Sequence, residues 1–167
     1  APRPPASRDH PTPNLDTLAR MQIVSALFVE NFEMRQAPGP STRIDLTGAM
    51  FSMAAPEPVP LTIAPHLVGL IFCPADETGQ GVFEVVFRRD LDADGEANGL
   101  GDNIARNVSP FSVEPGKFTY RLVRGELEFA EYGQIFAHCR VGRGAWHVVP
   151  FTLLPPVEPT SAAPAVE

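Results

Sequence analysis

Residues 82–89, with the sequence Val-Phe-Glu-Val-Val-Phe-Arg-Arg, alternate between two kinds of side chain. In an extended chain, Phe83, Val85 and Phe87 share one face, and Glu84 and Arg88 share the other. An amphipathic helix would instead repeat its apolar positions every three or four residues. The alternation therefore predicts a half-buried β-strand whose three apolar side chains point into a core.

Other strand-like segments recur along the chain, and Pro- or Gly-rich turns separate them. They cover residues 22–30, 42–53, 61–73, 104–113, 118–123, 126–129, 135–141 and 146–154. Phe118, Tyr120 and Leu122 share one face of their segment, and no segment has the pattern of an amphipathic helix. The sequence predicts an all-β fold, an antiparallel β-sandwich of about eight strands, with a barrel as the alternative.

The organisation along the chain follows from composition. A chain of 167 residues with 44% hydrophobic residues can bury one core without disulfide or metal support. Residues 1–20 contain five prolines and are expected to form a proline-rich arm. We expect a β-sandwich domain over residues 21–155 and a low-complexity tail over residues 156–167.

The net charge argues against one class of function, and the cysteines indicate a cellular location. The net charge is −7 and no basic patch with interleaved aromatic residues occurs, which argues against nucleic-acid binding. No apolar run reaches the length of a membrane span. The chain shows no apolar signal-peptide core, and Cys73 and Cys139 lie in apolar strands as expected of buried, reduced thiols. We therefore expect a cytoplasmic location.

An acidic segment, from Asp90 to Asp102, is the strongest motif for a cofactor. Its oxygen-bearing side chains alternate as in the first half of a calcium loop, with glycine at the sixth position. The twelfth position is Gly101 instead of a bidentate glutamate, and the flanks are strands, so a solvated acidic hairpin is the main expectation and no cofactor is required. A weak calcium site is the alternative, with these ligands: Asp90, Asp92, Asp94, Glu96 and Asn98.

No set of side chains assembles into a recognisable catalytic site. The chain lacks a G-x-S-x-G nucleophile elbow, and Glu126 and Glu128 share a face that suits solvent. His138 and His147 are expected to be surface neighbours across the hairpin that joins their strands. These patterns predict a protein that is not an enzyme.

Three further aromatic residues allow two interpretations. Trp146, Tyr120 and Tyr132 can fill the core or its edge, as such residues usually do, or they can form a platform for a ligand or partner.

Several patterns resemble a family of small, uncharacterised bacterial β-sandwich proteins. They are an M-x-h-x-x-A-L-h strand at 21–28, where h is apolar, an alternating strand with an aspartate-rich hairpin at 83–95, and closing strands at 129–135 and 150–153. The resemblance covers residues 21–155 and implies a sandwich without a known activity. The N-terminal arm and the enlarged acidic hairpin are departures from the family.

These observations lead to two hypotheses about function. The first is a non-enzymatic structural or protein-interaction module, a subunit of a larger assembly, whose tails bind a protein partner or another copy. The alternative is a small-ligand or calcium-dependent binding domain that uses the hairpin from Asp90 to Asp102.

Overall fold

The computed structural model describes residues 20–36, 38, 42–89 and 103–158. The described residues form strands and turns and contain no helix. There are eleven strands: β1 (Gln22–Gln36), β2 (Thr42–Met50), β3 (Ser52–Ala54), β4 (Leu61–Ile63), β5 (His66–Phe72), β6 (Gln80–Arg88), β7 (Asn103–Ser112), β8 (Phe118–Arg124), β9 (Leu127–Phe129), β10 (Gly133–Val141) and β11 (His147–Leu154). The predicted all-β class is confirmed.

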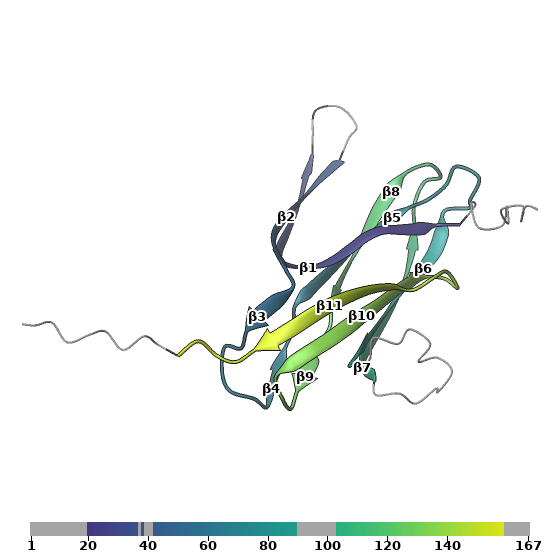
Figure 1. Ribbon diagram of the computed structural model, residues 1–167. Helices are drawn as coiled ribbons and strands as arrows, with labels where there is room; N and C mark the ends of the chain where they lie inside the picture. The colour runs from purple at the N-terminus through teal and green to yellow at the C-terminus, as the bar shows by residue number, and fades with distance from the viewer. Residues whose placement is uncertain (1–19, 37, 39–41, 90–102, 159–167) are drawn as a thin grey trace, which may run out of the picture.

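The strands build two main sheets that pack as a sandwich (Figure 1). Sheet A has the order β2-β1-β5-β8, and sheet B has the order β3-β11-β10-β6-β7. A small third sheet joins β4 to β9. All pairs are antiparallel except β3 with β11, which is parallel.

The core between the sheets contains the side chains that the alternation in 82–89 assigned to it. Phe83 and Val85 are fully buried and Phe87 is 1% exposed. Phe28 from sheet A meets Phe151 from sheet B, with ring centroids 4.9 Å apart. Gly69 of β5 leaves room for this core, because a Cβ atom there would lie 2.7 Å from the ring of Phe83.

The segment predicted as one strand over 42–53 is divided in the structure. β2 ends at Met50 in sheet A, Phe51 is 74% exposed, and β3 begins at Ser52 in sheet B. The chain therefore passes from one sheet to the other at Phe51, and this crossing joins the two sheets along one part of their shared edge.

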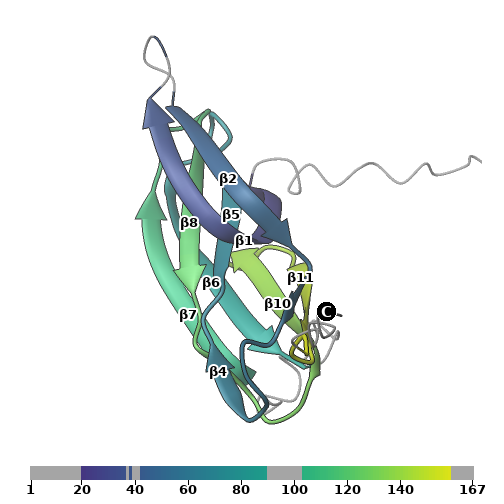
Figure 2. The same cartoon turned by 90° about the vertical axis from the view of Figure 1, so that its left-hand side faces the viewer.

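Strand β1 is longer than predicted because its two halves have different neighbours. Residues 22–29 pair with β5, whereas residues 28–36 pair with β2. In the described part of the chain, the second half of β1 pairs with no strand other than β2. Residues 30–36 and 42–48 thus form a two-stranded arm that projects from the sandwich and crosses sheet A in the side view (Figures 1 and 2).

The prediction that β6 is half-buried is wrong for one of its faces. Its inward face is as expected, but Glu84 and Arg88 on the other face are each only 8% exposed. From Phe83 to Arg88 the strand is buried on both faces, because it lies between β10 and β7 and long side chains from these neighbours cover it. The half-buried strand predicted from alternation is therefore wrong for the outer face.

Candidate interaction site

The proposed calcium ligands, Asp90, Asp92, Asp94, Glu96 and Asn98, lie outside the described residues, in the connection between β6 and β7. Within the ranges that the structure describes, no group of three or more His, Cys, Asp or Glu side chains is placed to hold a metal ion. The calcium hypothesis therefore stays a prediction from the sequence. Residues 1–19 of the proline-rich segment predicted over 1–20, and residues 159–167 of the tail predicted over 156–167, also lie outside the described residues.

The expected surface pair of His138 and His147 is wrong. The register of β10 with β11 places Cys139 opposite His147 and His138 opposite Val148, so the two histidines lie on opposite faces of sheet B. His138 is 2% exposed instead of lying on the surface.

Cys139 is the thiol that this register brings opposite a histidine. It is fully buried, and desolvation raises the pKa of its thiol to about 12. A thiol with such a pKa stays protonated and is a poor nucleophile near neutral pH. The described cysteines, Cys73 and Cys139, are both unpaired and buried, as the sequence predicted.

The three aromatic residues considered as a platform lie in three different places. Tyr120 contacts Phe32 of the arm, with ring centroids 4.9 Å apart. The hydroxyl of Tyr132 accepts a hydrogen bond from the backbone N–H of Val59 at 3.3 Å. Trp146 stacks with Arg140 on the outer side of sheet B. They do not form a single ligand surface.

The outer face of sheet B carries an ion network, which consists of Glu84, Arg106 and Arg140. Glu84 Oε2 accepts a hydrogen bond from Arg140 Nε at 2.7 Å, and Oε1 accepts one from Arg106 Nε at 2.9 Å. The guanidinium of Arg140 lies 4.1 Å from the ring centroid of Trp146, a cation–π contact. Strands β6, β7 and β10 each contribute one member, so the network ties three strands together.

Two opposing effects set the pKa of Glu84. Burial raises it, but the hydrogen bonds and the positive charges of Arg140 and Arg106 lower it more, so the pKa lies below its ordinary value of 4.5. Glu84 is therefore ionised at neutral pH and holds both guanidinium groups in place. Because its two oxygens are already bound to arginine, the network is a structural element and does not provide an open anion site.

The outer face of sheet A has the opposite composition. Its apolar face consists of residues that β5 and β8 point away from the core: Leu70, Phe72, Phe118, Tyr120 and Leu122. Phe118 is 64% exposed and Leu122 is 42% exposed. The rings of Phe72 and Phe118 pack at 4.9 Å. Large exposed apolar side chains that adjoin one another are typical of binding surfaces.

The two-stranded arm, residues 30–36 and 42–48, borders this apolar face. Phe32 of β1 contacts Tyr120, and Met34, two residues further along the same side of the strand, is 55% exposed. Val29 and Val68 are fully buried although they lie outside the inter-sheet core. The base of the arm thus packs on the outside of sheet A, and the apolar face continues from β8 onto the arm.

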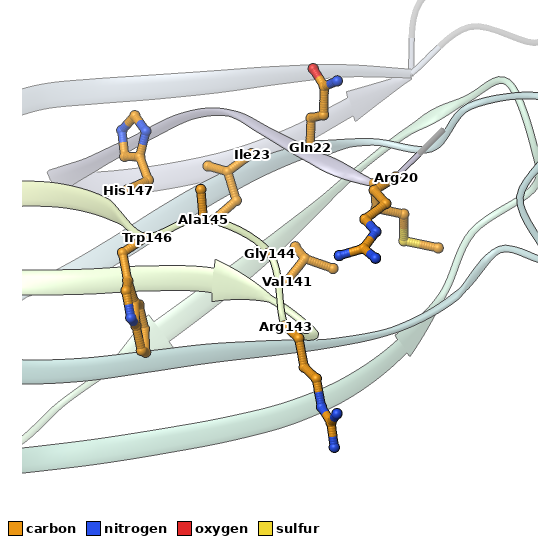
Figure 3. A pocket seen from close by; sticks show the side chains of 10 residues that line it. Arg20, Gln22, Ile23, Val141, Arg143, Gly144, Ala145, Trp146 and His147 are labelled. Carbon is orange, nitrogen blue, oxygen red and sulfur yellow. The ribbon is translucent and has the colours of Figure 1, made fainter. Parts of the chain in front are cut away.

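A hollow of about 630 Å³ lies where β1 begins, next to the turn between β10 and β11. Arg20 and Ile23 line it from the β1 side, and Val141 and Ala145 line it from the hairpin. Figure 3 shows the Arg20 side chain pointing towards the hairpin, while Trp146 points away from β1.

Sequence reasoning grouped Phe118, Tyr120 and Leu122 on one face but did not assign them to a surface. The signal that identifies this surface is the segment 66–72, His-Leu-Val-Gly-Leu-Ile-Phe, which is apolar on both faces. A strand in an outer layer with two apolar faces must be covered on both sides or expose one of them. The interpretation of Glu126 and Glu128 as solvated is confirmed, since both are exposed.

Comparison with protein-family models and with curated proteins finds no match for this chain. The resemblance to uncharacterised bacterial β-sandwich proteins therefore stays a prediction. Among the residues that the structure describes, no helix is long and apolar enough to cross a membrane.

Proposed function

We propose that this chain is a non-enzymatic protein-interaction module that assembles with a second copy of itself through the apolar face. The observation that carries the proposal is the exposure of Phe118 and Leu122 beside the projecting arm. Full burial of an exposed apolar side chain contributes about 1.5 to 3 kcal/mol, and Phe118 and Leu122 can contribute the share of this that corresponds to their exposed surface, 64% and 42%. The surface takes the role that the sequence-based hypothesis gave to the tails.

A second copy suits this surface because one chain carries both halves of a contact. The arm presents Met34, and the neighbouring β8 presents Phe118 and Leu122. In a two-fold arrangement, the arm of each copy can lie on β8 of the other. The exposed apolar side chains of the arm and of β8 are then covered in both copies.

The cysteines support a location for this assembly. Cys73 and Cys139 are buried and unpaired, which suits a reducing compartment. We therefore propose that the module acts in the cytoplasm.

Light scattering of the purified chain over a range of concentrations tests the proposal. We expect twice the mass of one chain, and we expect one chain mass for the double variant Phe118→Ser with Leu122→Ser. The matched control is Val82→Ser with Val108→Ser, because these residues are exposed apolar side chains of sheet B, at 39% and 48%. The control should keep the doubled mass.

Two results would overturn the proposal. One is a single-chain mass for the unmodified protein at all concentrations. The other is equal loss of the doubled mass in both double variants, which would mean that exposed apolar side chains promote association without a defined face.

A further inference from the structure

The first half of β1 has an open edge. Within the described residues, Gln22–Leu27 pairs with β5 on one side only, because β2 begins its pairing at Phe28 with Met50. The backbone groups on the other side of this stretch take part in no strand ladder of the described chain, although β11 lies nearby in the facing sheet. An unpaired edge of this kind is a template for another strand.

The first part of β11 also has an open edge. In the described part of the chain, residues 147–151 pair with β10 alone, because β3 pairs only with Thr152, Leu153 and Leu154. The crossing at Phe51 joins the two sheets at one end of their shared edge, and no such crossing joins them at the start of β1 within residues 20–36, 42–89 and 103–158. Two open strand edges thus lie on the same side of the sandwich, at its other end.

The hollow lies at this open end. It is bounded by the start of β1 and by the turn that leads into β11. Its apolar lining includes Ile23, Val141 and Ala145, and its charged lining consists of Arg20 and Arg143. None of the residues that line it is an Asp or Glu. Glu77 lines a smaller adjoining hollow on the side of β6.

The side chains of Arg20 and Arg143 point in different directions. In Figure 3 the guanidinium of Arg20 points towards Gly144 and Val141, whereas Arg143 points away from β1. Arg20 is therefore the cation placed to meet a group that enters from the open edge. A planar guanidinium binds a carboxylate through two parallel hydrogen bonds.

We propose that this open edge is a second binding site, separate from the apolar face, and that an extended peptide segment of a partner protein binds there as an added strand along Gln22–Leu27. The segment carries a carboxylate that pairs with Arg20. Main-chain hydrogen bonds to β1 supply affinity that does not depend on sequence, and the hollow and Arg20 supply selectivity. The stretch of six residues accommodates about 20 Å of extended chain.

An array of eight-residue peptides tests the site with the full-length chain. The peptides alternate Thr with Val, Ile or Leu and carry Glu or Gln at either end. We expect binding to Glu peptides and about tenfold weaker binding to Gln peptides, as loss of one charge-assisted contact implies. Peptides with proline at alternate positions should not bind, because proline cannot donate to a ladder.

Two variants separate the charge from the shape. Arg20→Glu should weaken binding of the Glu peptides about tenfold and leave the Gln peptides unchanged. Ala145→Trp should weaken both, because Ala145 lines the hollow and a large side chain there fills it. The matched control is Arg43→Glu on the arm, which changes the same charge on the same residue type far from the hollow and should have no effect.

Amide hydrogen exchange identifies the surface that binds. A bound Glu peptide should slow exchange within residues 22–27, and Phe118→Ser with Leu122→Ser should leave this protection intact, so that the site is tested separately from self-association. The inference is overturned if no array peptide binds, if proline peptides bind equally well, or if free acetate competes as strongly as a peptide. Protection confined to other residues would also overturn it.

Discussion

The outer faces of the two sheets differ in how far they cover a large side chain. On sheet A, Phe118 is 64% exposed, whereas on sheet B the charged Glu84 is only 8% exposed. Both residues lie on strands and both point away from the inter-sheet core. The difference is in their neighbours: Glu84 lies on an inner strand between long arginine side chains, whereas Phe118 lies on the edge strand β8. Position within the sheet, not polarity, decides which of the two is covered.

The largest effect we expect comes from the core that both faces share. Phe87→Ala should lower the free energy of unfolding by about 3 to 5 kcal/mol, because it leaves a cavity where a ring now packs at 1% exposure. Phe83→Ala should cost a similar amount. Denaturant unfolding measures both, and unchanged stability in both variants would mean that the inward face of β6 does not form the core.

A smaller loss should follow from the ion network on sheet B. Glu84→Gln removes the charge that pairs with Arg140, whose side chain is 16% exposed, and should cost about 1.5 to 3 kcal/mol near neutral pH, the range for a hydrogen bond to a charged group. The control is Glu128→Gln, an exposed carboxylate outside the network. A cost as small as that of the control would show that the outer face of sheet B adds little to stability.

The same network predicts a pH dependence with a definite sign. The pKa of Glu84 is lowered by folding, so its contribution is complete above the ordinary value of 4.5 and is lost as the pH falls through the lower folded value. The stability difference between the unmodified chain and Glu84→Gln should therefore shrink on acidification below 4.5. Unfolding curves measured at a series of acidic pH values check this, and a difference that is constant with pH contradicts it.

The apolar face of sheet A should give the smallest change in stability. Phe118→Ser with Leu122→Ser removes side chains that already contact solvent, so unfolding of the separated chain should change by no more than about 1 kcal/mol. Measurement at a concentration too low for association gives the change in the free energy of unfolding of the single chain. A loss as large as that of Phe87→Ala would mean that Phe118 and Leu122 belong to the fold and not to an interface.

Chemical reactivity offers a check that is independent of stability. Cys139 should react with a thiol reagent only at the rate at which the protein opens, since its pKa is raised to about 12 and its sulfur is buried. Mass spectrometry of the labelled chain measures this rate. Rapid labelling of Cys139 under native conditions would contradict the register of β10 with β11.

The sequence predicted the fold class and most strand positions because alternation and turn residues are local signals. Phe83, Val85 and Phe87 could be placed in the core from their spacing alone. The burial of Glu84 could not, because it depends on Arg106 and Arg140 from strands that are distant in sequence.

Register was a second source of error. The pairing of His138 and His147 required knowing which residue lies opposite which, and a shift of one residue moves every side chain to the other face. The structure pairs Cys139 with His147, and the prediction failed for this reason. The division of β2 from β3 at Phe51 likewise follows from a change of sheet, which hydrophobicity does not record.

The arm has a consequence for how the chain can be redesigned. Its strands keep one constant register from Val29 opposite Ala49 to Gln36 opposite Thr42, and no other strand of the described chain adjoins its outer half. Inserting two residues into each strand should therefore lengthen the arm while keeping Phe32 and Met34 on the same side. Inserting one residue into a single strand should turn part of that side over or create a bulge. The reach of the arm is thus adjustable in steps of two residues, without repacking of the sandwich.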